Sequence, residues 1–269
     1  MLNALTIEIM ENKFEHLKQL VYEGAKNKMP DINDVVLDRI SYELNTIKKL
    51  DFIDYFILYS RIIEVCNEFK LLRSYGRGSA PNSIVNYCLD ITNINPIEEN
   101  LIFERFIHPT QKQLPDIDID IPKGWQKKVI EKLKQNYPEY YTYSIAFLPK
   151  SENDYEAIAY NNVNYKIHPC GIAITTQEIG YSTFQFSGQD FYLANDIQND
   201  PYYYDKIDIL ELYYLNRLQL IANEVGNNYH PYKLPLTDKK VFKLFVEGNL
   251  ENIFQFNVHS LKSILQNFR

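Results

Sequence analysis

The first quarter of the chain places apolar residues at the spacing of helices. Up to Lys28 these residues recur every three or four positions, at Ile7, Met10, Phe14, Leu17 and Val21. This spacing predicts one amphipathic helix. Residues 30–34 offer a break with N-cap side chains, and a second helix is predicted from Val35. An apolar stretch at residues 55–69 predicts a third helix. We expect all three to serve as scaffold.

Short strands and helices are predicted along the rest of the chain. The expected strands lie around residues 145–147, 172–174 and 204–210. The expected helices lie at residues 101–106, 125–133, 212–225 and 258–268, with another that is capped at 236–238 and continues through Phe245. Residues 137–164 are polar and rich in tyrosine, so apart from the first strand we expect a loop there.

Residues 114–121 alternate acidic and apolar side chains with a period of two. In a β-strand this pattern puts Asp116, Asp118 and Asp120 on one face, and isoleucines on the other face, which can be buried. Neighbouring carboxylates repel one another unless water screens them or a divalent cation bridges them. The pattern fits either a solvated edge strand or a Mg²⁺ site. A calcium loop is excluded, because its sixth and twelfth positions hold Ile and Lys instead of Gly and Glu.

A stretch rich in glycine and serine, residues 74–83, precedes an apolar run. Glycines and hydroxyls that open a helix can bind an anion through backbone N–H groups and the helix dipole. The stretch is not a P-loop, and Pro81 stands where a dinucleotide fingerprint needs its last glycine. Taken alone, it fits a plain turn and helix cap better than an anion site. The lysines after residue 125 form a solvated face or, beside a metal site, a phosphate contact.

Composition narrows the class of protein. The chain has 269 residues, of which 45% are hydrophobic and 23% charged, and this supports a packed core. A net charge of −7 argues against a large autonomous nucleic-acid surface but is compatible with a local one. We see no apolar run long enough to cross a bilayer and no secretory signal, so we expect a cytoplasmic protein without membrane association.

Three scattered cysteines, Cys66, Cys88 and Cys170, are expected to be reduced, buried thiols. The tripeptide His168-Pro169-Cys170 is too short to be a zinc site, and no second pair of Cys or His accompanies it. The sequence alone therefore predicts no zinc centre.

Five motifs follow one another in a characteristic order. They are Gly76-Arg77-Gly78-Ser79, Phe103-Glu104-Arg105-Phe106, Pro115-Asp116-Ile117-Asp118-Ile119-Asp120, His168-Pro169-Cys170-Gly171 and Lys206-Ile207-Asp208-Ile209-Leu210. In this order and spacing they resemble the palm of the bacterial replicative DNA polymerase III alpha subunit. The resemblance covers most of the chain, and the first motif followed by the acidic strand is its most specific part.

This resemblance implies an α+β fold, namely a nucleotidyltransferase-type palm related to polymerase beta, with a mixed sheet and helices packed on one side. It implies two Mg²⁺ ions, or Mn²⁺, held by Asp118, Asp120 and Asp208, whereas Asp116 matches a family position not assigned to metal. The residues implied to hold the incoming nucleoside triphosphate are Arg77, Gly78, Ser79 and Lys206. These three acids are expected to converge on one point facing the Gly78-Ser79 turn.

The resemblance also implies a layout. Residues 1–72 would be the N-terminal helical part of the palm, and residues 73–225 its core. A reduced thumb insertion would lie around 137–164, and 226–269 would start a truncated fingers region. The chain departs from the family pattern at three places, at Gln111, Asn82 and Pro169-Cys170. We also expect no histidine- and acid-rich domain before the palm.

Two functions are expected from these observations. The first is two-metal phosphoryl transfer from a nucleoside triphosphate to a primer 3′-hydroxyl on primer–template DNA, with a companion or replisome protein supplying missing parts. The second is a catalytically inactive palm-like protein that binds DNA, nucleotide or a replication partner. A structural remnant is a third, weaker alternative.

Overall fold

The computed structural model describes residues 4–147, 157–161, 163–179, 183–194, 205–226, 234–235, 237–251, 253, 256 and 259–266. The chain divides into two compact units, Met1–Ile221 and Ala222–Arg269, which are described separately below. Among the described residues, no helix has the length and apolar character needed to span a bilayer.

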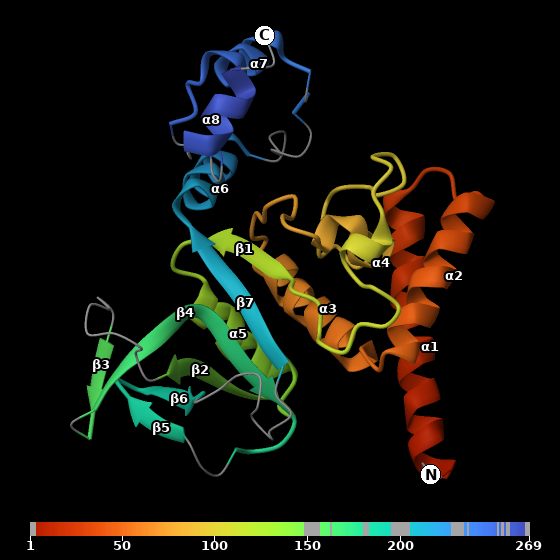
Figure 1. The fold of residues 1–269 in the computed structure, drawn as a ribbon. Helices are drawn as coiled ribbons and strands as arrows, with labels where there is room; N and C mark the ends of the chain where they lie inside the picture. Colours follow the sequence, from red (N-terminus) through yellow and green to blue (C-terminus); the bar gives the residue numbers. More distant parts are fainter. Residues whose placement is uncertain are drawn as a thin grey trace. The chain divides into compact units, whose positions relative to one another are not determined.

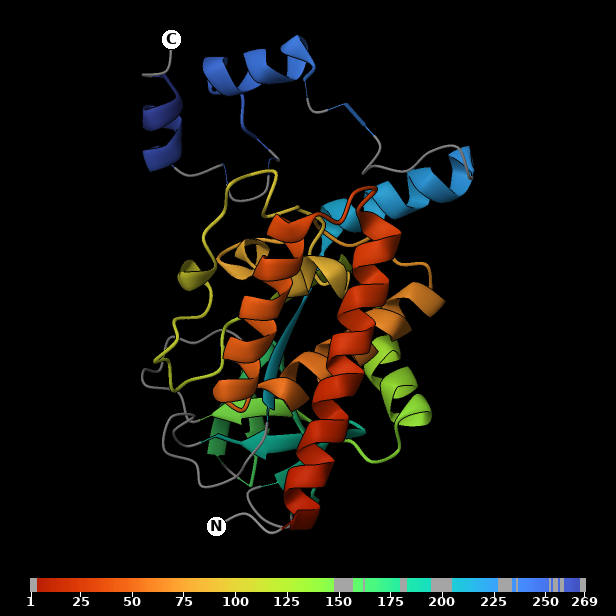
Figure 2. The same cartoon turned by 90° about the vertical axis from the view of Figure 1, so that its right-hand side faces the viewer.

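Three long helices begin the first unit, as the apolar spacing predicts. They are α1 (Ala4–Lys28), α2 (Asp34–Lys49) and α3 (Ile53–Glu68). Asn33 caps α2 by accepting a hydrogen bond from the Val36 amide. Helices α1 and α2 lie side by side, and α3 runs beneath the sheet (Figures 1 and 2). Their apolar faces share one core with the sheet.

The glycine-rich stretch leads into two short helical segments, η1 (Ala80–Asn82) and α4 (Ile84–Cys88). Glu43 of α2 is fully buried at the start of α4. Its carboxylate accepts hydrogen bonds from the Ser83 hydroxyl at 2.7 Å and from the Ile84 and Val85 amides at 3.1 Å each. The Arg39 Nε lies 2.7 Å from the same carboxylate. A side chain from α2 therefore occupies the N-terminus of α4, where an anion had been considered.

The described strands form one mixed sheet of seven strands in the order β1-β7-β4-β2-β6-β5, with β3 paired to β4. The strands are β1 (Asp118–Pro122), β2 (Tyr141–Phe147), β3 (Ala157–Tyr160), β4 (Val163–Thr175), β5 (Thr183–Phe186), β6 (Gln189–Leu193) and β7 (Asp205–Leu212). The pairs β1–β7 and β2–β6 are parallel, and the others are antiparallel. In Figure 1, β7 lies between β1 and β4.

One face of this sheet is covered by helices. Ile119 of β1 and Ile207 and Ile209 of β7 belong to the same core as the buried residues of α3. Helix α5 (Gln126–Asn136) packs against α3 and contacts β2 and β7. The alternation of side chains then directs Asp118 and Asp208 to the opposite face. The predicted α+β fold with a mixed sheet and packed helices is confirmed at this level.

Several predicted elements differ in extent from the observed ones. The segment predicted as mostly loop, residues 137–164, contains β2 and β3, and its residues 148–156 and 162 lie outside the described part. No prediction covers β5 and β6. These two strands have four and five residues, with polar and apolar positions that give little periodic signal. The strand predicted around residues 172–174 is the last part of the longer β4, which contains an irregularity at His168, because the pairing with β2 shifts between Ser144 and Ile145. A short helix expected near residue 103 is the 3₁₀ segment η2 (Phe103–Arg105).

Helix α6 (Tyr213–Val225) follows β7 directly, as predicted. In the second unit, α7 (Lys239–Glu247) is capped by Asp238, whose carboxylate accepts a hydrogen bond from the Lys240 amide. It ends at Gly248, whose φ of 73° lies in the left-handed region that glycine adopts most readily. The last described helix is α8 (His259–Gln266). The helices predicted here are therefore confirmed over the described residues, while residues 236, 258, 267 and 268 of these predictions lie outside them.

The buried Glu43 carboxylate supports one stability prediction. Replacing Glu43 with Ala leaves the α4 amides and the Arg39 guanidinium without their shared acceptor, so we expect the free energy of unfolding to fall by about 3 kcal/mol. Urea unfolding followed by circular dichroism measures this loss, and Glu43→Gln should lose less. Hydrogen exchange over residues 80–89 should also become faster.

The exposed Glu15 on α1 offers a matched control, because Glu15→Ala removes only a surface ion pair with Lys18. We expect that variant to stay within about 0.5 kcal/mol of the parent. If Glu43→Ala proved as mild as Glu15→Ala, the capping role of Glu43 would be wrong.

Candidate active site

Parallel pairing of β1 with β7 builds the candidate site. Asp118 is directly beside Asp208 in this register, although the two residues are far apart in the chain. Carboxylate oxygens of Asp116, Asp118 and Asp208 all lie within 4.8 Å of one another. We call these three residues the carboxylate cluster. The predicted proximity of Asp118 and Asp208 is thus present in the structure.

Two buried tyrosines of α3 hold the backbone around Asp116 in place. The Tyr55 hydroxyl donates to the Pro115 carbonyl at 2.6 Å, and the Tyr59 hydroxyl donates to the Ile117 carbonyl at 2.7 Å. Both hydroxyls satisfy carbonyls that precede β1 and are not part of its ladder. They fix the backbone on either side of Asp116.

The chemistry of the carboxylate cluster suits a hard divalent cation. Burial raises the pKa of Asp118 above its ordinary value, and the neighbouring Asp116 and Asp208 raise it further, while Arg77 opposes the change. A bound Mg²⁺ would relieve this repulsion, since Mg²⁺ prefers carboxylate oxygens and keeps room for water or phosphate. The donor set therefore fits the ion that the family resemblance implies.

Asp120 has a different environment from the other acids. Its side chain is fully buried, and its carboxylate accepts a 2.8 Å hydrogen bond from the Ser74 hydroxyl. Arg77 Nε lies 3.3 Å from both Asp120 oxygens. Asp120 therefore faces the glycine-rich stretch, whereas Asp116, which the resemblance leaves unassigned, lies in the carboxylate cluster. The assignment of Asp120 as a metal ligand stays a prediction.

Arg77 joins the glycine-rich stretch to the acidic strand. Its Nη1 atom lies 2.6 Å from Asp118 Oδ2, and its Nε faces Asp120. The flanking Gly76 and Gly78 have φ values of 100° and 64°, which favour glycine. A Cβ on Gly78 would meet no atom within 4 Å, so the backbone there is open to a ligand. Arg77, Gly78 and Ser79 thus lie next to Asp118 and Asp120, and their predicted role toward a triphosphate stays a prediction.

Lys206 and His168 surround Asp208. Lys206 Nζ lies 2.7 Å from Asp208 Oδ2, and His168 Nε2 lies 3.1 Å from Oδ1. Burial alone would raise the pKa of Asp208, but these two partners hold it below its ordinary value. The hydrogen bond to Asp208 in turn raises the pKa of His168 to about 9. Lys206 therefore neutralises the Asp208 carboxylate in this structure. Its place near a triphosphate stays a prediction.

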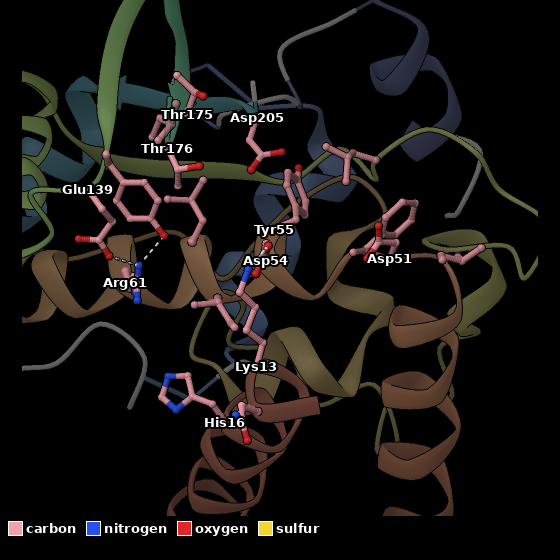
Figure 3. A pocket seen from close by; sticks show the side chains of 18 of the residues that line it. Lys13, His16, Asp51, Asp54, Tyr55, Arg61, Glu139, Thr175, Thr176 and Asp205 are labelled. Atoms are coloured by element: carbon pink, nitrogen blue, oxygen red, sulfur yellow. Dashed lines mark hydrogen bonds and ion pairs between the residues drawn. The ribbon is translucent and has the colours of Figure 1, made fainter. Parts of the chain in front are cut away.

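A separate cavity of about 880 Å³ lies between α1, α3 and the ends of β4 and β7 (Figure 3). Asp205 points into it near Tyr55, and Lys13 lies 2.7 Å from Asp54 at another part of its wall. Because Asp205 and Asp208 are three residues apart on one strand, their side chains leave opposite faces of the sheet. The cavity is therefore distinct from the carboxylate cluster.

Asp205 gives a prediction with a defined pH window. Burial, together with the charge of Asp54, raises the pKa of Asp205 from 3.8 to about 6. Between these two values the folded state keeps a proton that the unfolded state has lost, so this residue makes stability fall as pH rises. Asp205→Asn removes the free-energy cost of ionising a buried carboxyl group. We expect the variant to be more stable above pH 6 by about 1 kcal/mol or more, and equal to the parent below about pH 4.

Urea unfolding at a series of pH values measures this difference, with Asp38→Asn on the exposed surface of α2 as the control. A gain that is constant with pH, or one that grows toward acid, would contradict the assigned cause.

Comparison with known proteins adds family evidence to this geometry. A family model described as the bacterial DNA polymerase III alpha NTPase domain matches residues 15–158. The matched segment contains the glycine-rich stretch and the acidic strand, while Asp208 lies beyond it.

Similar curated proteins cover only part of this chain or are much longer than it. A DNA polymerase III subunit alpha of Ureaplasma parvum is 42% identical over 127 residues, which make up 46% of this chain and 13% of that protein. An error-prone DNA polymerase of Bdellovibrio bacteriovorus is 39% identical over 126 residues, or 46% of this chain and 12% of that protein. A DNA polymerase III subunit alpha of Staphylococcus aureus is 27% identical over 301 residues, covering 88% of this chain and 28% of that protein.

Proposed function

This chain belongs to the family of the bacterial DNA polymerase III alpha NTPase domain, and from that premise we propose that it is the palm of a nucleotidyltransferase. The proposed reaction transfers a nucleotide from a nucleoside triphosphate to the 3′-hydroxyl of a DNA primer. The chain spans 28% or less of the length of the relatives described above. We further propose that a companion or replisome protein takes part in holding primer–template DNA, and the cytoplasm is the expected place of action.

The observation that carries this proposal is the meeting of Asp118 and Asp208 on adjacent parallel strands, beside Arg77. Carboxylates from two strands on one open face are what a two-metal phosphoryl-transfer site requires. Within the proposed layout, residues 73–225 form the palm core on a helical base of residues 1–72. Residues 137–164 form a reduced thumb, and residues 226–269 start the fingers.

The residues of this chain would act as follows. Asp118, Asp120 and Asp208 would hold the divalent ions, which when bound supply the charge that activates the 3′-hydroxyl and neutralises the leaving pyrophosphate. Arg77 would exchange its carboxylate partners for triphosphate oxygens, since a guanidinium binds phosphate in a bidentate way. Gly78 and Ser79 would let the backbone approach the same phosphates, and Lys206 would add a further cation.

Metal binding provides the first test. We expect Asp118→Asn and Asp208→Asn to weaken Mg²⁺ or Mn²⁺ binding by at least about 100-fold. Each substitution removes a metal ligand, and even the loss of a residue that only orients a ligand lowers metal affinity by about 10- to 100-fold. Isothermal titration with Mg²⁺ or Mn²⁺ in the presence of nucleoside triphosphate measures the affinity for the metal. Extension of a short primer–template measures the reaction. Asp38→Asn is the control and should behave like the parent. Equal metal affinity in all variants would overturn the proposed ion site.

The role of the third acid is testable by comparing Asp120→Asn with Asp116→Asn. If Asp120 turns from Arg77 to the ions when a triphosphate binds, Asp120→Asn should lose nucleotide transfer by at least about 100-fold, and Asp116→Asn should keep most of it. Primer extension reads the difference, and thermal melting shows whether both variants stay folded. If Asp116→Asn lost more activity than Asp120→Asn, Asp116 would be the third ligand in place of Asp120.

A second function is favoured by one observation. Arg77 and Lys206 already pair with Asp118 and Asp208, an arrangement that suits a palm-like protein that binds nucleotide, DNA or a replication partner without catalysis. Triphosphate or DNA binding that is insensitive to Asp118→Asn, together with no primer extension, would favour this alternative.

A further inference from the structure

His168 and Cys170 meet Asp208 at an irregularity in β4. In the pairing with β2, Ile145 is opposite His168 while Ser144 is opposite Ile172, so residues 169–171 lie between two registered pairs. On the other side of β4, Gly171 is paired with Asp208 of β7. A bulge of this kind re-aims side chains, and here it brings an imidazole, a thiol and a carboxylate together.

The three ligand atoms are spaced like those of a metal site. His168 Nε2 lies 3.1 Å from Asp208 Oδ1, and Cys170 Sγ lies 3.9 Å from each of these two atoms. With Zn–S near ~2.3 Å and Zn–N or Zn–O near ~2.0 Å, tetrahedral ligands stand roughly 3.3 to 3.6 Å apart. The observed set differs from that spacing by only a few tenths of an ångström. All three groups offer a ligand atom within 4.8 Å of the others.

Neighbouring residues hold this arrangement in place. A Cβ on Gly171 would stand 2.1 Å from His168 Cδ2, so the imidazole lies over a position that only glycine leaves open. Gln126 Nε2 donates to the Pro169 carbonyl at 3.0 Å and to the Ile209 carbonyl at 2.9 Å, which ties the bulge to β7. The ring and the thiol are both partly exposed, which leaves a path for an ion.

We propose that His168, Cys170 and Asp208 form a three-ligand site for a thiophilic divalent cation, with Zn²⁺ as the natural candidate and a fourth position open to water. Thiolate and imidazole ligands favour Zn²⁺ or Co²⁺ over Mg²⁺, which prefers oxygen. The spacing of His168 and Cys170 along the chain does not by itself indicate this site, because the third ligand, Asp208, comes from another strand. The site shares Asp208 with the carboxylate cluster but uses a different ligand set, and its existence does not depend on the proposed nucleotide transfer.

Cobalt offers a direct test on the full chain. Co²⁺ bound through a thiolate in a tetrahedral site absorbs in the near ultraviolet by charge transfer and in the visible by ligand-field bands. We expect the parent to develop both bands with one equivalent of Co²⁺ and to lose them when Zn²⁺ is added. The charge-transfer band should be absent in Cys170→Ala, and both bands should weaken in His168→Ala.

Zn²⁺ affinity, measured by competition with a chromophoric chelator, should fall by at least about 10-fold in these two variants. His16→Ala removes an exposed histidine of α1 and should match the parent. Melting curves without metal show whether each variant is folded. No thiolate band in the parent, or an unchanged band in Cys170→Ala, would overturn the proposal. Because the spectrum reads the metal alone, a chain without polymerase activity would still give it.

Discussion

Parallel pairing between β1 and β7 is the constraint on which the site depends. It places like charges next to each other, since Asp118 and Asp208 share a register position, and such an arrangement is unfavourable by itself. The chain offsets that repulsion with its own cations: Arg77 spans Asp118 and Asp120, and Lys206 contacts Asp208. The acids are therefore held close together at nearly balanced local charge. In the proposed reaction, a metal ion or a phosphate would enter by exchange with these partners, which would avoid a large change in net charge.

The glycine-rich stretch is held from the helical side. Glu43 takes up the first amides of α4 and the Ser83 hydroxyl, so the end of the stretch is anchored before any ligand arrives. Ser74 and Arg77 fix its beginning to Asp120. The open backbone around Gly78 lies between these two anchors. Preorganisation of this kind would lower the entropic cost of binding the proposed triphosphate.

Local patterns in the sequence were enough to predict part of this structure. The spacing of apolar residues gave the long helices, and the alternation near Asp118 gave a strand with one acidic face. The burial of Glu43 also had a signal, because Glu43 lies on the apolar face of α2 between Ile40 and Ile47.

The rest of the structure depends on contacts between distant segments. No periodicity relates Asp208 to Asp118; only the family resemblance suggested that they meet. Nothing in the sequence indicated that His168 and Cys170 meet Asp208, because Asp208 belongs to another strand. The short strands β5 and β6 gave almost no periodic signal, and their pairing is decided by tertiary packing. The carboxyl groups of Asp116 and Asp120 illustrate a further limit, since only three-dimensional structure shows which of them faces Arg77.

The order of strands has an evolutionary consequence. The connection between β1 and β7 includes α5 and, among the described residues, five strands, and it returns beside its starting point. The free-energy cost of closing such a connection rises slowly, by about 0.6 kcal/mol for each doubling of a flexible length. Insertions or deletions in the loops of this connection can therefore accumulate while the two acidic strands keep their register. A lineage that shortens or lengthens these loops can change the surface around the site without disturbing the carboxylates themselves.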